Sequence, residues 1–292
     1  VTVDPIPAVT NGTLTQSICG SGTASFTPVI SVGGSTYTWS STVLSGSVSG
    51  VTASGTNVPV SDNLTNSGSV AAVVRYRVTP TGPVSTLCVG SFVDYVVTVN
   101  PVPTVSASAQ SICSGATSNV VISNPNGVVG TTFSWTLGTV VGAVSGQGAG
   151  SGTVISQTLS SVAGGSVEYL VVASSNGCSS AVFPVVVTVN PVPVGNSVGA
   201  GTNVVCSGTA LNIVPTSSVG SSTYSWTGSN GSGGTGNITD TPVNSGTSPI
   251  NITYTVVPTG PTPTFCVGGP FTIVVTVDPI PAVTNGTLTQ SI

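Results

Sequence analysis

Residues 93–103 read VDYVVTVNPVP, and the chain repeats this stretch as FPVVVTVNPVP at 183–193 and as FTIVVTVDPIP at 271–281. Before each Pro-x-Pro segment, apolar residues occupy every second position. That period of two is typical of a β-strand with one face in a core. The residues predicted to face inward are Val93, Tyr95, Val97, Val99, Phe183, Val185, Val187, Val189, Phe271, Ile273, Val275 and Val277. Each copy therefore predicts the last strand of a unit followed by a linker.

The Pro-x-Pro segments divide the chain into units of similar length. A fourth segment, DPIP at 4–7, precedes the first unit, and successive segments are 96, 90 and 88 residues apart. Because proline fixes φ and lacks a backbone donor, we predict short, stiff linkers here. The predicted units are 1–100, 101–190 and 191–278. The linker prolines are Pro5, Pro7, Pro101, Pro103, Pro191, Pro193, Pro279 and Pro281.

A longer repeat encloses the three units. Residues 1–18 read VTVDPIPAVTNGTLTQSI, and residues 275–292 are identical, at an offset of 274 residues. Identity over eighteen positions indicates that the copied block is the three-unit cassette and not the single unit. We predict that residues 279–292 form the first strand of a further unit.

Each unit also contains the same motifs in the same order. An aromatic-x-Trp pair, read in TYTWS, TFSWT and TYSWT, is followed by a strand with a central tyrosine. We predict that these tryptophans and tyrosines are core residues: Trp39, Trp135, Trp226, Tyr76, Tyr169 and Tyr254. Gly, Ser, Asn and Pro clusters separate the strands, and no helical period appears. The sequence therefore predicts an all-β fold of three tandem β-sandwiches, each the size of an immunoglobulin-like domain.

The composition argues against catalysis and against several classes of ligand. Charged residues make up 3% of the chain, there is no histidine, and the only cations are Arg75 and Arg77. Without His or Lys, the usual nucleophile arrangements cannot be built, and the six acids are scattered singly. We therefore expect no enzyme, no cofactor and no metal site. A net charge of −4 without a basic patch argues against nucleic acid binding. No apolar run approaches the ~20 residues of a membrane helix.

Two surface features have ordinary explanations. Arg75 and Arg77 flank Tyr76, so both point outward, and we interpret them as a solvated pair facing Asp94 instead of an anion or glycan site. Asn-x-Ser/Thr sequences are a by-product of the high Ser, Thr and Asn content. O-linked glycans on surface Ser and Thr are one candidate partner, since they would help so uncharged a surface to stay soluble.

The ordered motifs resemble the PKD-like and immunoglobulin-like repeats of very long surface proteins of Bacteroidota. The resemblance rests on five motifs in order: a first cysteine, the Tyr-x-Trp pair, the later tyrosine, a second cysteine and VTVNPxP. It covers all three units, whose first cysteines are Cys19, Cys113 and Cys206 and whose second cysteines are Cys88, Cys178 and Cys266. It implies an extracellular or cell-surface protein of an adhesin, a gliding-motility filament or another fibre. It also implies export through the general secretion route and type IX machinery.

The six cysteines, two in each unit, have no metal-site spacing and predict disulfides in an oxidising compartment. The first cysteine precedes the tryptophan by 20, 22 and 20 residues, and the second follows the tyrosine by 12, 9 and 12. In antibody domains these spacings are roughly a dozen residues and two residues. The first cysteine is therefore expected near the start of the second strand, and the second in the turn before the last strand. Each cysteine is displaced from its antibody position by about 23 Å of strand, and the two displacements run in opposite directions. The two cysteines of a unit are therefore expected at opposite ends of its sandwich.

A disulfide needs Cα atoms within roughly 7 Å, and the first-cysteine end of one unit abuts the second-cysteine end of the next. We therefore favour the interdomain bridges Cys19–Cys178 and Cys113–Cys266, with Cys206 bonded to the counterpart of Cys88 in a following repeat. The alternative is one bridge within each unit: Cys19–Cys88, Cys113–Cys178 and Cys206–Cys266.

The sequence predicts the structural shaft of a secreted filament, stiffened by its proline linkers and disulfides. The alternative is the stalk of a cell-surface adhesin or gliding-motility filament that presents a binding tip outside this stretch. The expected partners are further copies of the same repeat, in the same chain or in neighbouring chains. Strand exchange between separate subunits is a less simple arrangement of the same repeats.

Overall fold

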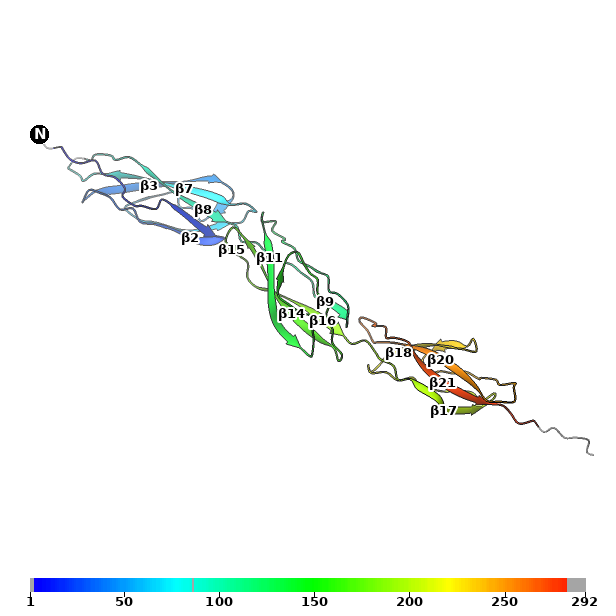
Figure 1. Ribbon diagram of the computed structural model, residues 1–292. Helices are drawn as coiled ribbons and strands as arrows, with labels where there is room; N and C mark the ends of the chain where they lie inside the picture. Colours follow the sequence, from blue (N-terminus) through cyan, green and yellow to red (C-terminus); the bar gives the residue numbers. More distant parts are fainter. Residues whose placement is uncertain (1–2, 86, 283–292) are drawn as a thin grey trace, which may run out of the picture.

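The computed structural model describes residues 3–85 and 87–282, which form an extended row of three β-domains (Figure 1). The described residues contain strands and no helix. The all-β, tandem-sandwich prediction is therefore confirmed. The last strands of the domains end at Asn100, Asn190 and Asp278, each one residue before a Pro-x-Pro segment. Of the predicted further strand at 279–292, residues 279–282 form no strand and the rest lie outside the described residues.

Domain 1 contains two facing sheets. Its strands are β1 (Thr15–Cys19), β2 (Ser21–Phe26), β3 (Thr36–Ser45), β4 (Val48–Ser49), β5 (Ser54–Thr56), β6 (Val60–Asn66), β7 (Ala72–Thr81) and β8 (Val93–Asn100). One sheet has the order β1-β8-β7-β3-β5, and the other has the order β2-β6-β4.

Domains 2 and 3 repeat the larger sheet. Domain 2 has β9 (Gln110–Cys113), β10 (Val120–Val121), β11 (Thr132–Val141), β12 (Gly150–Ser151), β13 (Val154–Ile155), β14 (Gly165–Ser175), β15 (Cys178–Ser179) and β16 (Phe183–Asn190). Its sheets are β12-β11-β14-β16-β9, with β15 paired to β14, and β10-β13. Domain 3 has β17 (Val198–Cys206), β18 (Thr223–Gly228), β19 (Gly233–Thr235), β20 (Ile250–Thr259) and β21 (Phe271–Asp278), in the order β17-β21-β20-β18-β19.

Each core is centred on one tryptophan and one tyrosine. The three tryptophans are 4%, 6% and 4% exposed, and the three tyrosines are fully buried. Trp39 packs edge-on against Tyr76 with ring centroids 5.6 Å apart, and Trp226 packs in the same way against Tyr254 at 5.8 Å. The predicted inward residues of the last strands are buried, except that Val93 and Phe183, at the strand starts, are half-buried.

Each buried tyrosine hydroxyl has a polar partner from the strand or loop that precedes the tyrosine strand. Tyr76 Oη donates to Asp62 Oδ2 over 2.6 Å, and Tyr254 Oη donates to Asp240 Oδ2 over 2.6 Å. Burial and the neighbouring carboxylate raise the pKa of both tyrosines, so the phenols remain donors. Burial opposes ionisation of Asp240, but its hydrogen bonds, the one from Tyr254 foremost, hold its pKa below the usual range.

A glycine faces each core tryptophan from the adjacent strand. Gly55, Gly150 and Gly234 are the register partners of Trp39, Trp135 and Trp226. A Cβ atom at Gly150 would lie 2.7 Å from Cζ2 of Trp135, closer than real Cβ contacts allow. The indole rings therefore pack directly against the glycines, and any side chain there must displace the ring.

We expect Gly150→Ala to lower the free energy of unfolding of domain 2 by about 1–3 kcal/mol, because the added methyl group overpacks the core against Trp135. Differential scanning calorimetry measures this. Gly148→Ala is the matched control, since a Cβ there would meet the Gln157 side chain at an ordinary 3.8 Å. Equal effects of the two substitutions would contradict the packing explanation.

Candidate functional site at the domain junctions

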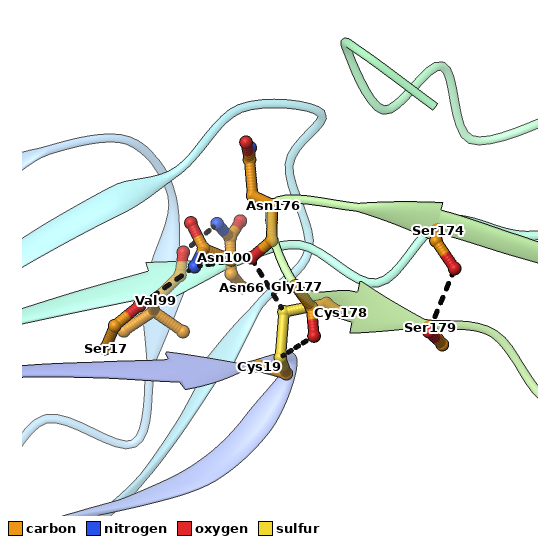
Figure 2. The surroundings of a disulfide bond; sticks show 10 residues. All are labelled: Ser17, Cys19, Asn66, Val99, Asn100, Ser174, Asn176, Gly177, Cys178 and Ser179. Carbon is orange, nitrogen blue, oxygen red and sulfur yellow. Dashed lines mark hydrogen bonds between the residues drawn. A yellow bond between two sulfur atoms is a disulfide. The ribbon is translucent and has the colours of Figure 1, made fainter. Parts of the chain in front are cut away.

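The structure joins neighbouring domains through two disulfides. Cys19 of domain 1 is bonded to Cys178 of domain 2, with Cα atoms 5.5 Å apart (Figure 2). Cys113 of domain 2 is bonded to Cys266 of domain 3, with Cα atoms 5.6 Å apart. Both bonds follow the interdomain scheme and not the intradomain alternative. The remaining cysteines, Cys88 and Cys206, are free in this chain.

The first cysteine of each pair is placed by parallel strand pairing. β1 pairs with β8 so that Cys19 lies opposite Asn100, and β9 pairs with β16 so that Cys113 lies opposite Asn190. Cys19 is thus the last residue of β1, and β2 begins only at Ser21. Cys19 therefore lies near the start of the second strand, as expected, but it belongs to the end of the first strand. The separation comes from Gly20, whose φ of +46° breaks the strand between them.

Cys178 is placed by a tight hairpin between β14 and β15. Ser175 pairs with Cys178, and the two residues between them, Asn176 and Gly177, have φ angles of +49° and +78°. Positive φ at both central residues and an Asn-Gly sequence are typical of a type I′ turn. The hairpin presents the sulfur at the tip of domain 2 that faces domain 1.

Cys266 is held by a longer loop between β20 and β21. Gly260 N donates to Cys266 O over 2.8 Å, and Gly268 N donates to Pro258 O over 2.8 Å. These bonds close the loop across its base. Cys266, in this loop, lies beside the last strand of domain 2. The Sγ atom of Cys266 is 4.0 Å from the carbonyl oxygen of Asn190. A two-residue hairpin at the first junction and a longer loop at the second thus place a cysteine at the same position, beside the last strand of the preceding domain.

The linker lies beside each disulfide and is held by side chains. Asn126 Nδ2 of domain 2 donates to Val102 O over 2.8 Å, and Gly20 packs so closely on Val102 that a Cβ would lie 2.7 Å from it. The linker prolines within the junctions are buried or half-buried: Pro101, Pro103, Pro191 and Pro193. Elsewhere Pro7 is buried, Pro279 is half-buried, and Pro5 and Pro281 are exposed.

Hydrogen bonds cross the first junction at two further points. Asn100 Nδ2 donates to Asn176 O of domain 2 over 3.5 Å, close to the disulfide (Figure 2). On another loop, Val129 N of domain 2 donates to Ser69 O of domain 1 over 3.1 Å. The first two domains are thus connected by a linker, a disulfide and hydrogen bonds.

A buried asparagine shapes the loop that carries Ser69. Asn66 Nδ2 donates to Val70 O over 2.9 Å and to Val99 O over 2.7 Å, and its Oδ1 accepts from Gly68 N over 2.8 Å. These bonds fix residues 66–70 against β8, and Figure 2 shows the one from Asn66 to Val99. Asn66 was not among the residues predicted from the sequence, although the Asn-Ser-Gly sequence at 66–68 is a turn signal.

The charged residues of domain 1 are not part of the junctions. Arg77 makes two 2.8 Å hydrogen bonds to Asp94 and lies over the Phe92 ring at 3.8 Å. The hydrogen bond from Arg77 holds the pKa of Asp94 below its usual range. Arg75 contacts Thr42 instead of Asp94, so the predicted pairing applies to Arg77 alone. Within the described ranges, no three His, Cys, Asp or Glu residues are grouped as metal ligands would be. No helix among the described residues could cross a membrane.

Comparisons with known proteins identify the domain type. A family model described as "PKD-like domain" matches residues 16–103, 110–193 and 203–281. A search of curated proteins found no match. Among solved structures, mouse cadherin-23 EC22-24 is 14% identical, with 95% of this chain and 100% of that chain covered and a TM-score of 0.37. Extracellular domains 3–5 of Drosophila OTK are 10% identical, with 96% and 99% covered and a TM-score of 0.33.

The junction hydrogen bond between Val129 and Ser69 allows a direct test of the disulfide's mechanical role. In the double variant Cys19→Ser/Cys178→Ser, we expect the Val129 amide to exchange with solvent at least about tenfold faster, because the junction then opens more often. NMR-detected hydrogen exchange measures this rate.

The matched control is Cys113→Ser/Cys266→Ser, which removes the disulfide at the opposite end of domain 2 and is expected to leave Val129 exchange unchanged. If removal of the Cys19–Cys178 bond leaves this exchange rate as it is, the disulfide does not hold the junction closed.

Proposed function

Because the chain belongs to the PKD-like domain family over all three units, we propose that it is the structural shaft of a secreted, extracellular filament. The observation that carries the proposal is that each junction has two covalent connections, the proline linker and an interdomain disulfide. A single linker lets two domains hinge about it. A second covalent connection at another point of the same interface removes most of that freedom.

The junction chemistry also supports an extracellular location. Cys19 is exposed and Cys178 is buried, so cytosolic reductants would reach the disulfide from the Cys19 side. Structural disulfides of this kind persist in oxidising compartments.

The rest of the molecule fits a load-bearing and non-catalytic role. Each of the three cores contains a buried tryptophan, a buried tyrosine and a glycine opposite the tryptophan, so the three domains are built alike. A shaft needs equivalent units, and the 274-residue repeat supplies them at the level of the cassette. The low charge keeps electrostatic repulsion between neighbouring shafts small.

Strand lengths give the dimensions of such a shaft. The longest strand, β14, has 11 residues and spans about 36 Å, so a domain with its linker is roughly 35–45 Å long. Three domains then give an axial period of about 110–130 Å. One cassette would advance the filament by this distance.

Electron microscopy of the natural, secreted assembly tests this proposal. We expect regular fibres with an axial repeat of about 110–130 Å, straight under oxidising conditions and curved after treatment with dithiothreitol. Fibres that bear a separate head, with the cassette confined to a stalk beneath it, would instead identify an adhesin stalk. Free, unassembled molecules would contradict both functions.

A further inference from the structure

The two free cysteines lie at the ends of domains 1 and 3 that face away from domain 2. Cys88 lies in the loop between β7 and β8, and Cys206 is the last residue of β17. Cys206 is exposed and Cys88 is half-buried. In Figure 1, domains 1 and 3 occupy the two ends of the row. The Cys88 end of domain 1 can be compared with the Cys266 end of domain 3, and the Cys206 end of domain 3 with the Cys19 end of domain 1.

The described residues of the Cys88 loop share several backbone features with the Cys266 loop, which is docked on domain 2, although only the Cys266 loop has a cis peptide bond, at Thr262–Pro263. In both loops a residue preceding the cysteine has positive φ: Leu87 at 51° and Phe265 at 47°. Both loops also have the same three hydrogen bonds from a backbone N–H to a carbonyl oxygen. In the Cys88 loop they run from Gly82 to Cys88, from Gly90 to Pro80 and from Leu87 to Pro83. In the Cys266 loop their counterparts run, in the same order, from Gly260 to Cys266, from Gly268 to Pro258 and from Phe265 to Pro261. Domain 1 therefore carries a loop closed by the same backbone hydrogen bonds as the loop that closes the second junction.

The Cys206 end of domain 3 reproduces the Cys19 end of domain 1, which is also docked on domain 2. Cys206 lies opposite Asp278 in parallel register, as Cys19 lies opposite Asn100. Asn244 takes the place of Asn66: its Nδ2 donates to Ser248 O over 2.9 Å and to Val277 O over 2.8 Å, and its Oδ1 accepts from Gly246 N over 2.9 Å. Both halves of a further junction are thus present, and each half is of a type already joined to domain 2.

We propose that the Cys206 end of domain 3 is a docking surface for a second copy of domain 1, closed by a disulfide between Cys206 and Cys88 of that copy. The inference rests on the proposed function and identifies the partner of the shaft. It agrees with the sequence, since residues 275–292 repeat residues 1–18 and so lead from domain 3 into the beginning of a domain 1.

The two surfaces also match in their non-covalent groups. Thr247 occupies the position of Ser69, whose carbonyl oxygen accepts from Val129 N across the first junction. Gly33 occupies the position of Val129, since both lie six residues before the core tryptophan. We expect Gly33 N to donate to Thr247 O. A hollow beside Thr247 is lined by residues 244–247 and 279–282, and Val84 and Leu87 are exposed. We expect this hollow to receive the Val84 and Leu87 side chains of the incoming loop.

Asp278 differs from Asn100, because a carboxylate cannot donate a hydrogen bond as Asn100 does to Asn176. This difference does not prevent closure. In the second junction, Asn190 donates to Ser111 and Ile112 of its own domain, and the Cys113–Cys266 bond forms beside it. The long Cys88 loop is of the type that closes this second junction.

Pairing of two single-thiol variants of the full chain tests the proposal. Cys88→Ser retains Cys206, and Cys206→Ser retains Cys88. The two are mixed in equal amounts, with one of them isotopically labelled, and oxidised in a glutathione buffer. Non-reducing electrophoresis and mass spectrometry then count the dimers. We expect heterodimers joined through Cys206 and Cys88 to outnumber the two homodimers together by about tenfold, whereas random coupling gives equal amounts, because docking places only these two thiols together. The statistical yield of random thiol coupling would overturn the proposal.

A third variant separates docking from thiol reactivity. Asn244→Ala in the Cys88→Ser chain keeps the Cys206 thiol but removes the hydrogen bonds that shape residues 244–248. With native folding verified by circular dichroism, we expect its heterodimer yield to fall to the statistical value, and an unchanged yield would contradict the docking surface. Proteolytic digestion of the same samples under non-reducing conditions also shows whether the Cys19–Cys178 and Cys113–Cys266 peptides are present. Their absence would overturn the proposed function, whereas their presence with random pairing of Cys206 would overturn only this inference.

Discussion

The parallel pairing of the first strand with the last strand is the constraint on which the junctions depend. It places Cys19 opposite Asn100 and Cys113 opposite Asn190, at the residue where each domain passes into its linker. A thiol at this position cannot reach the far end of its own domain, but it lies next to the first loops of the following domain. The same pairing orders the proline linker, because Gly20 N donates to Asn100 O over 2.7 Å and Ser114 N donates to Asn190 O over 2.8 Å. Strand register thus determines disulfide connectivity.

Much of this organisation could be predicted from the sequence, because it depends on periodic patterns. The alternation in 93–99 identifies a strand with one buried face, and the Pro-x-Pro segments identify the ends of the domains. The displaced spacings of Cys19 and Cys178 favour interdomain bonds, since strand length converts directly into distance. These inferences need only the rise of a strand and the reach of a disulfide.

Other features depend on contacts between distant residues, which a single sequence does not reveal. The glycines opposite the tryptophans, such as Gly150 opposite Trp135, are known only once the register of β11 and β12 is known. Arg75 and Arg77 lie on the same strand face, yet only Arg77 reaches Asp94, because Asp94 is its register partner on β8. The Asn-Gly dipeptide at 176–177 differs from these features, since an Asn-Gly dipeptide by itself indicates the type I′ hairpin that joins β14 to β15.

In this structure, disulfides join each domain to the next, and none joins two cysteines of one domain. Peptide mapping of the oxidised chain under non-reducing conditions measures this connectivity. We expect linked peptides containing Cys19 with Cys178 and Cys113 with Cys266. Recovery of a peptide that links Cys19 to Cys88, or Cys113 to Cys178, would contradict this connectivity.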